Sequence, residues 1–337
     1  MKIAYIVPSL AAKGPILVVQ DLSELMIKNG HECIIYYFDD IVEIEATCST
    51  KQIEGIIDFS KFDIVHSHGL RPDRYVSKYR ERSGKVKYIS TIHNYILEDF
   101  RYEYNWFIAQ TFGRLWIKIL KKMDKIVTLT NNAIKYYNKW LPESKTTFAY
   151  NTRIISQHKI LSKDEKVCVE DFKKDDVLLG INALLTNRKG IDQIIKALPF
   201  LPKHKLFIVG DGKAKSDLEV LASNLGVKDR CYFAGYVKDA YRYMEYYDIY
   251  VASSRSEGFP LMLLEAAQYK VPTVCSRIPV FEEIFCPDEV SFFELDNIPS
   301  LVDAIKNVPD GNKMYERYNR CYTPQKFYER YIDIYRN

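Results

Sequence analysis

Short runs rich in Val, Ile, Tyr and Phe alternate along the chain with longer segments in which apolar residues recur at helical spacing. This alternation is typical of repeated strand–helix units, which build a parallel β-sheet with helices on its faces. The predicted strands of the first series are 2–7, 31–38, 63–67, 87–92, 125–130 and 146–150. Those of the second series are 177–185, 205–210, 231–234, 248–253 and 271–276. Two α/β lobes are therefore expected.

A polar stretch, 155–176, lies between the two series. Few of its residues are apolar, so we interpret it as a linker. After Pro324, apolar residues again recur at helical spacing, which predicts a last helix that packs on the first lobe. The expected domains are 1–160, 161–318 and, for the returning helix, 319–337.

Length and composition agree with this division. A chain of 337 residues exceeds the roughly 100–200 residues of most single domains. Apolar residues make up 47% of the sequence and charged residues 27%, so the chain is expected to be globular rather than disordered. The formal net charge is only +4 and the basic residues are dispersed, which argues against nucleic-acid binding.

Cysteine usage points to a reducing compartment. The seven cysteines are scattered and contain no C-x-x-C pair, so they fit neither a disulfide framework nor a zinc site. Residues 1–8 hold one basic residue and a short apolar run broken by proline, which is shorter than a signal peptide or a membrane span requires. The expected location is the cytoplasm.

The loop after the predicted strand 248–253 has the features of an anion site. It leads into Pro260–Ala267, a strong helix-forming segment with proline in its first turn. Gly258 allows close backbone approach just before this helix. The free backbone N–H groups of a helix N-terminus attract negative charge, so a diphosphate is the expected ligand.

Two carboxylates, Glu257 and Glu265, flank that predicted phosphate position. With a rise of about 1.5 Å per residue, they should bracket it by roughly 6–10 Å. Carboxylates do not hold phosphate, but they accept hydrogen bonds from hydroxyls, one from a transferred sugar and the other from a ribose. A structural role also fits each alone, Glu265 as a surface carboxylate and Glu257 as a complement to the helix dipole.

Glu257-Gly258-Phe259-Pro260 with Glu265 resembles the E-x7-E signature of retaining glycosyltransferase family 4. The resemblance covers residues 177–285, with fainter matches in the first lobe, and it implies the GT-B fold. In that fold two Rossmann-like domains face each other across a cleft, the first binding the acceptor and the second the nucleotide sugar. Three further segments occur in the family's order and spacing, namely Arg188-Lys189-Gly190-Ile191-Asp192, Val209-Gly210-Asp211-Gly212 and Phe233-Ala234-Gly235-Tyr236-Val237.

Lys189 follows the predicted strand 177–185, where its ammonium could neutralise a leaving diphosphate. The family usually carries an arginine five or six residues before that lysine, where this chain has Leu184 and Ala183, so Arg188 is predicted to replace it. An Arg-Lys pair is also typical of a solvated turn. The resemblance implies donor-binding roles for Arg188, Asp211, Tyr236, Val237, Gly258, Phe259, Pro260, Leu261 and Glu265.

Two of these segments have alternative interpretations. Val209–Gly212 resembles half of a dinucleotide fingerprint, but the full G-x-G-x-x-G pattern is absent, which removes the main support for a dehydrogenase. The backbone near Tyr236 and Val237 would contact the nucleotide base by family resemblance. Tyr236 fits equally well a half-buried aromatic residue at a strand end.

In the first lobe, Thr91-Ile92-His93-Asn94-Tyr95 resembles the family's strand-end histidine, which lies near the reacting sugar. The resemblance therefore assigns His93 to the catalytic set with Lys189 and Glu257, although a lone histidine is more often structural. Of the glycine pair that the family often carries after its first strand, this chain retains only Gly14. Gly14 and Tyr95 are the predicted acceptor contacts.

His66 and His68 resemble the family's D-V-V-H-x-H strand, where one ring usually supports the cleft rather than reacting. Their spacing places both side chains on one face of the strand. No third ligand is evident in the sequence, so a metal site is not expected there.

The absence of a D-x-D pair removes the usual carboxylate motif for Mg²⁺ or Mn²⁺ on a sugar nucleotide, which predicts transfer without a metal or other cofactor. The family resemblance implies retention of anomeric configuration, a UDP- or GDP-linked sugar as co-substrate, and a glycan or lipid-linked acceptor. One alternative is a sugar-nucleotide epimerase or phosphorylase on the same fold. Another is a non-catalytic protein that binds a sugar nucleotide or a glycan.

Residues 104–122 combine aromatic side chains with lysines, and their spacing predicts an amphipathic helix. One interpretation is a helix packed on the sheet, which is the commoner arrangement. The other is weak contact with the inner face of the cell membrane, which would make the protein peripheral to the membrane.

Overall fold

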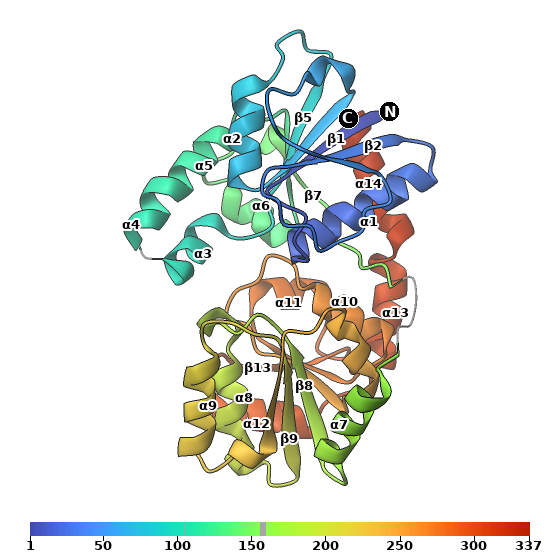
Figure 1. The fold of residues 1–337 in the computed structure, drawn as a ribbon. Coiled ribbons are helices and arrows are strands. Elements are labelled where there is room, and N and C mark those ends of the chain that lie inside the picture. The colour runs from blue at the N-terminus through green and yellow to red at the C-terminus, as the bar shows by residue number, and fades with distance from the viewer. Residues whose placement is uncertain (105, 156–159) are drawn as a thin grey trace. The chain divides into compact units, whose positions relative to one another are not determined.

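The computed structural model describes residues 1–104, 106–155 and 160–337. The chain forms two compact units (Figure 1). The first unit comprises Met1–Ile154 together with Tyr322–Asn337, and the second comprises Ile155–Cys321. Each unit is a parallel β-sheet with helices on its faces, so the predicted fold class is confirmed.

The sheet of the first unit has the strand order β3-β2-β1-β4-β5-β6-β7. Strand β1 pairs with both β2 and β4, and its residues Ile3–Val7 are buried because helices cover the sheet on both faces. The strands are β1 (Lys2–Val7), β2 (Glu32–Tyr37), β3 (Ser49–Gln52), β4 (Ile64–His68), β5 (Lys87–Thr91), β6 (Lys125–Thr128) and β7 (Thr146–Phe148).

The helices of the first unit connect these strands and include one that returns from the end of the chain. They are α1 (Gly14–Lys28), α2 (Leu70–Tyr79), α3 (Ile96–Glu103), α4 (Trp106–Ile108), α5 (Arg114–Leu120), α6 (Asn131–Tyr137) and α14 (Pro324–Arg336). A π-helical turn, Ala109–Gly113, joins α4 to α5. Helix α14 packs beside α1, so the predicted return of the last helix to the first lobe is confirmed.

The sheet of the second unit has the strand order β10-β9-β8-β11-β12-β13. Its strands are β8 (Val177–Asn182), β9 (His204–Val209), β10 (Cys231–Gly235), β11 (Ile249–Ala252), β12 (Thr273–Ser276) and β13 (Ser291–Phe293). Its helices are α7 (Lys163–Lys173), α8 (Ile191–Ala197), α9 (Lys215–Asn224), α10 (Leu261–Gln268), α11 (Pro279–Ile284), α12 (Ile298–Lys306) and α13 (Asn312–Cys321).

Two strands and one helix differ from the sequence-based expectation. Strand β3 is polar and exposed, and β13 has only three residues, so neither shows the apolar run by which strands were predicted. The polar stretch 155–176 is not simply a linker, because α7 forms within it. The Ser162 side chain accepts from the Glu165 backbone N–H while the Glu165 carboxylate accepts from that of Ser162, which is a capping box. Residues 156–159 of the predicted linker lie outside the described residues.

The strand order reverses direction once in each sheet. In the first unit the reversal falls between β1 and β4, and in the second unit between β8 and β11. Loops that leave the carboxyl ends of two such strands diverge to opposite sides of the sheet, which opens a crevice where α/β proteins bind ligands. The fold therefore points to the loops after β1 and β4 in the first unit and to those after β8 and β11 in the second.

None of the helices in the described parts of the chain combines the length and the apolar character needed to cross a membrane.

A buried carboxylate links three elements of the first unit. Asp73 of α2 accepts hydrogen bonds from the Ser67 hydroxyl of β4 and from the Trp116 indole N–H of α5, both at 2.6 Å. Burial raises the pKa of Asp73 to about 6, although these hydrogen bonds act in the opposite direction. The folded state therefore holds this proton more tightly than the unfolded state does.

This shift predicts that the first unit loses stability as pH rises from about 4 to about 6, because unfolding then releases Asp73 to its lower, solvated pKa. Asp73→Asn, which mimics the protonated form, should gain on the order of 1–3 kcal/mol relative to wild type over that range. Urea unfolding followed by tryptophan fluorescence reports on this unit, since all three tryptophans lie in it. Asp39→Asn, at an exposed carboxylate, is the control; equal pH profiles for wild type and Asp73→Asn would contradict the assignment.

Candidate functional site

The loops that leave β8 and β11 carry the acidic and basic residues singled out in the second unit. The β8 loop forms a short 3-10 turn, Asn187–Lys189, before α8. The β11 loop runs through residues 253–260 into α10, which begins at Leu261 with Pro260 as its N-cap. Because β8 and β11 are neighbours at the reversal point, the two loops lie side by side.

Lys189 and Glu257 form a buried ion pair across these loops. The Lys189 ammonium donates to Oε1 of Glu257, and the Ser254 hydroxyl donates to the same oxygen at 2.6 Å. An Arg188 guanidinium nitrogen lies 3.4 Å from Oε2 of Glu257 and donates to the Ser256 carbonyl at 2.8 Å. Lys189 is 8% exposed and Glu257 6% exposed.

The cations determine the charge state of this cluster. Burial alone would raise the pKa of Glu257, but the charges of Lys189 and Arg188 outweigh it, so the pKa lies below the ordinary value. Glu257 is thus a carboxylate at neutral pH. Two cations against one carboxylate leave these three residues with one net positive charge beside the N-terminus of α10, an environment that favours an anion.

The β8 and β11 loops pack closely because the residue of the β8 loop at their contact, Gly190, has no side chain. Gly190 has φ of +63°, and a Cβ there would lie 2.2 Å from the Ser253 carbonyl oxygen. The Ser253 hydroxyl donates to the Lys189 carbonyl at 2.9 Å, and the Gln193 amide donates to the Ser253 carbonyl at 3.0 Å. Any side chain at position 190 would therefore push apart the loops that carry Lys189 and Glu257.

Arg255 was not predicted from the sequence, yet it makes several contacts between these loops. Its backbone N–H donates to the Arg188 carbonyl at 2.7 Å, and its guanidinium donates to the Asn187 carbonyl at 2.7 Å. The guanidinium also pairs with both oxygens of Asp192, at 2.9 and 3.1 Å, and with Asp296 at 2.5 Å. Arg255 thereby holds the turn that carries Arg188.

The two carboxylates of the E-x7-E pattern both lie near one tyrosine. Burial raises the pKa of Tyr250 far above its ordinary value, and the negative charges of Glu265 and Glu257 raise it further. Glu265 lies half-buried in the second turn of α10. Of the intervening donor-site residues, Phe259 and Pro260 are buried, while Gly258 and Leu261 are half-buried.

The remaining predicted donor residues follow β9 and β10. A Cβ at Gly210 would lie 1.9 Å from the Ala183 carbonyl oxygen, so the β9 loop is held against the β8 loop. Asp211 is exposed, and its carboxylate accepts from the Gly212 backbone N–H at 2.7 Å. Tyr236 is 64% exposed, so its interpretation as a half-buried aromatic is wrong, and Val237 beside it is half-buried.

The predicted catalytic histidine and acceptor contacts lie in the first unit. His93 is half-buried in the loop after β5, and its Nε2 lies 2.8 Å from Nδ1 of His68. Tyr95 is buried and donates its hydroxyl hydrogen to Asn132 at 2.7 Å. Gly14 is the exposed first residue of α1. Within the described residues, no group of three or more His, Cys, Asp or Glu side chains is arranged to hold a metal ion.

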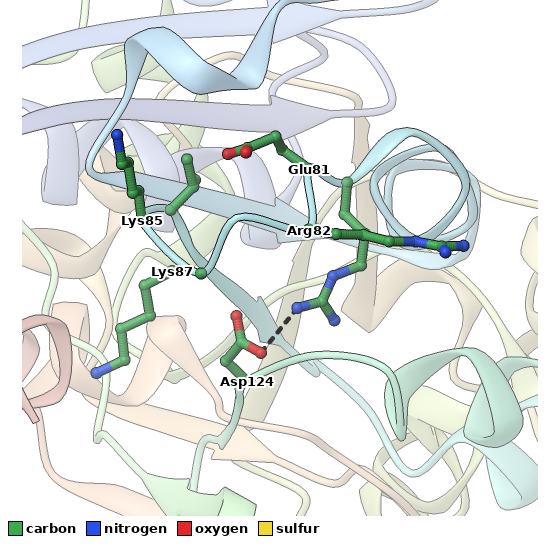
Figure 2. A pocket seen from close by; sticks show the side chains of 8 residues that line it. Glu81, Arg82, Lys85, Lys87 and Asp124 are labelled. Carbon is green, nitrogen blue, oxygen red and sulfur yellow. Dashed lines mark hydrogen bonds and ion pairs between the residues drawn. The ribbon is translucent and has the colours of Figure 1, made fainter.

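A separate hollow of about 520 Å³ lies at the amino ends of β5 and β6, at the end of the first sheet opposite to His93 (Figure 2). Lys87, at the amino end of β5, and Asp124, just before β6, belong to its lining, and Arg80 pairs with Asp124 at 2.9 Å. None of the predicted site residues borders it. The lining consists of Arg80, Glu81, Arg82, Gly84, Lys85, Val86, Lys87 and Asp124.

Two protein families match this chain. The family described as "Glycosyl transferases group 1" matches residues 162–321, and "Glycosyltransferase Family 4" matches residues 14–152. The O-antigen biosynthesis glycosyltransferase WclY of Escherichia coli is 33% identical over 350 residues, which cover 99% of this chain and 94% of that protein.

Solved structures also match over nearly the whole length. Sucrose-phosphate synthase from Thermosynechococcus elongatus has a TM-score of 0.82 at 17% identity and covers 99% of this chain and 98% of its own. Anabaena Alr3699/HepE, solved in complex with UDP-glucose, has a TM-score of 0.80 at 15% identity and covers 99% of both chains. At these identities the likeness shows a shared fold.

Arg255→Ala should destabilise the second unit by about 1–3 kcal/mol, because Asp192 and the Asn187 carbonyl lose a partly buried partner. Urea unfolding followed by far-ultraviolet circular dichroism measures the change. Arg277→Ala is the matched control, because Arg277 also pairs with two carboxylates, Glu282 and Glu294, but on the surface, where a loss of under about 0.5 kcal/mol is expected. Equal losses in the two variants would contradict a bracing role for Arg255.

Proposed function

This chain belongs to the GT-B glycosyltransferases of family 4, and on that premise we propose that it transfers a sugar from a nucleoside diphosphate sugar to a hydroxyl group with retention of configuration and without a metal. The observation that carries this proposal is the net positive cluster of Arg188, Lys189 and Glu257 at the strand-order reversal of the second unit. It combines cations for a diphosphate with a carboxylate for sugar hydroxyls.

The donor is proposed to be a UDP- or GDP-linked sugar. HepE, which shares the fold, has been solved with UDP-glucose, which favours UDP. The ammonium of Lys189 has three N–H donors, so it can contact a phosphate oxygen while it keeps its bond to Glu257. Arg188 and the N-terminus of α10 supply the remaining positive potential for the phosphates. Asp211, Tyr236, Val237 and Glu265 complete the proposed donor contacts.

The reaction is a substitution at the anomeric carbon. The bond from this carbon to the diphosphate oxygen breaks, and the electron pair leaves with the diphosphate. The acceptor hydroxyl oxygen bonds to the same face, and its proton passes to the departing phosphate oxygen, so the configuration is retained. Lys189 and Arg188 stabilise the charge that develops on the leaving group, Glu257 orients the donor sugar, and His93 is proposed to contact the reacting sugar.

The proposed acceptor is a hydroxyl of a glycan or of a lipid-linked saccharide. Support comes from the relative WclY, which is named for O-antigen biosynthesis. We place the reaction in the cytoplasm, where sugar nucleotides would reach it without crossing a membrane. Gly14 and Tyr95 remain the predicted acceptor contacts.

Wild-type protein should release UDP or GDP from a sugar nucleotide only when an acceptor is present, and Glu257→Ala should lower turnover by about 100-fold or more, because the donor sugar loses its orienting carboxylate. A coupled assay of nucleoside diphosphate release, with mass spectrometry of the product, measures both. Glu282→Ala, at an exposed carboxylate, is the control. Epimerised sugar nucleotide without acceptor dependence would indicate the epimerase alternative, and donor binding without turnover the non-catalytic one.

We also propose that the segment from α4 to α5 contacts an anionic membrane surface. Trp116, Ile117 and Leu120 of α5 are buried in the core, as the packed-helix interpretation requires. Helix α4, which lies at the periphery of the first unit in Figure 1, exposes large apolar side chains, since Trp106 is 65% and Phe107 68% exposed. Residues 104–122 contain no acidic residue, and their exposed cations are Arg114, Lys118, Lys121 and Lys122.

Wild-type protein should float with vesicles that contain phosphatidylglycerol but not with pure phosphatidylcholine vesicles, and the bound fraction should fall with salt. Exchanging Trp106 and Phe107 for serine should lower the bound fraction several-fold, because the aromatic side chains would insert at the interface. Phe200→Ser, at an exposed aromatic residue of the second unit, is the control. Absence of salt-sensitive flotation, or equal loss in the control, would contradict membrane contact.

A further inference from the structure

Three histidines of the first unit form a cluster at the carboxyl ends of β4 and β5. His66 and His68 lie on the same face of β4, with ring centroids 4.3 Å apart, and His93 follows β5. The His68 ring is tilted by 32° to that of His93, with centroids 5.1 Å apart. Nδ1 of His68 and Nε2 of His93 are 2.8 Å apart, which is a hydrogen-bond distance.

The second ring nitrogen of His68 is unusual. His68 is fully buried, and its Nε2 has no hydrogen-bond partner in the part of the chain that the structure describes. The Nδ1 of His93, by contrast, belongs to a half-buried residue, and no hydrogen bond to it occurs among the described residues. In the His68–His93 pair, Nε2 of His68 is therefore buried without a partner, while Nδ1 of His93 is open to a ligand.

Burial keeps the whole cluster uncharged. Burial lowers the pKa of His93 and the pKa of His66 to about 3 each, and it also lowers the pKa of His68. Repulsion from a charged His93 is a further cause of the lowered pKa of His66. Two neutral rings joined by one hydrogen bond share a single proton across it, so only two arrangements exist. In one, His68 donates from Nδ1 and its Nε2 is bare. In the other, His93 donates from Nε2 and His68 carries a proton on Nε2.

The second arrangement would bury an N–H group without an acceptor, and buried donors without a partner are rarer in proteins than buried acceptors without one. The first arrangement is therefore favoured. In it, Nε2 of His93 is occupied as an acceptor, and the neutral ring must carry its own proton on Nδ1, the open end.

We propose that His68 is a positioning residue that fixes the tautomer of His93, so that His93 presents an Nδ1–H donor to an oxygen of the bound sugar or phosphate. This inference rests on the proposed function in one respect, the placement of His93 at the reacting sugar. A bare Nδ1 would accept from a sugar hydroxyl instead, so the tautomer decides which oxygen atoms His93 can stabilise.

The returning helix α14 contacts one member of this cluster, His66, and its neighbour Thr91. The Tyr335 hydroxyl lies 2.8 Å from Nδ1 of His66, whose Nε2 lies 2.8 Å from the Thr91 hydroxyl. The Tyr331 hydroxyl lies 3.2 Å from the same Thr91 oxygen. Both ring nitrogens of His66 are therefore occupied, and His66 packs against His68 without a hydrogen bond to His93. This makes His66 a matched control for His68.

Nitrogen-15 spectra of histidine-labelled protein measure the tautomer directly, because protonated and bare ring nitrogens have different chemical shifts. In wild type, His93, identified by its loss in His93→Gln, should show protonated Nδ1 and bare Nε2. His68→Ala should return His93 to a mixture of tautomers. His68→Asn, which can place an amide N–H where Nδ1 lies, should restore the wild-type pattern, and His68→Gln should not.

Activity should follow the tautomer. In the transfer assay, kcat/KM should fall about tenfold in His68→Ala and His68→Gln, the effect of one misdirected hydrogen bond, and recover in His68→Asn. His66→Asn should alter thermal stability but leave the His93 tautomer unchanged. A wild-type His93 protonated on Nε2, or equal losses in His68→Asn and His68→Ala, would overturn the proposal. Because the spectra need no turnover, a protein without transfer activity would refute the proposed function and leave the tautomer result intact.

Discussion

The buried ion pair between Lys189 and Glu257 is the interaction on which the candidate site of the second unit depends. Removing two such charges from water is costly, and their mutual attraction in the interior often fails to compensate for that cost. Here the deficit is reduced by further hydrogen bonds, since Ser254 donates to one carboxylate oxygen and Arg188 lies near the other. An apolar pair would stabilise the fold at least as well, so the presence of this pair is better explained by a ligand than by stability.

The close approach of two loops makes the pair possible. Gly190 lets the turn after β8 lie against the Ser253 carbonyl, and Arg255 fastens the same turn to Asp192 and Asp296. The sheet topology places both loops at the point where the strand order reverses. The first unit shows a parallel case, in which the Tyr335 hydroxyl of α14 contacts His66 of β4 and the Tyr331 hydroxyl contacts Thr91 of β5.

The sequence predicts those features that depend on local pattern. Most strands of both sheets follow from short apolar runs, but β3 is polar and pairs with β2 at the edge of its sheet, and β13 has only three residues. Helix α7 has a local signal in its capping box, but a single fully buried residue, Val169, gives it little apolar periodicity. The sequence predicts that Lys189 and Glu257 share a site, because both follow strands and match a family pattern, although they lie 68 positions apart. Arg255 has no such signal, since its partner Asp192 lies 63 positions away and only the folded loops bring them together.

Lys189, held by Glu257, is the proposed contact for the donor diphosphate. Calorimetric titration with UDP and GDP tests it most directly, using wild type, Lys189→Met and the exposed-lysine control Lys196→Met. The double variant Lys189→Met with Glu257→Gln also removes the negative charge of the carboxylate that loses its lysine partner in the single variant. The nucleotide that wild type binds should bind about 10- to 100-fold more weakly to both Lys189 variants and with unchanged affinity to the control. Unchanged affinity in the Lys189 variants would contradict it.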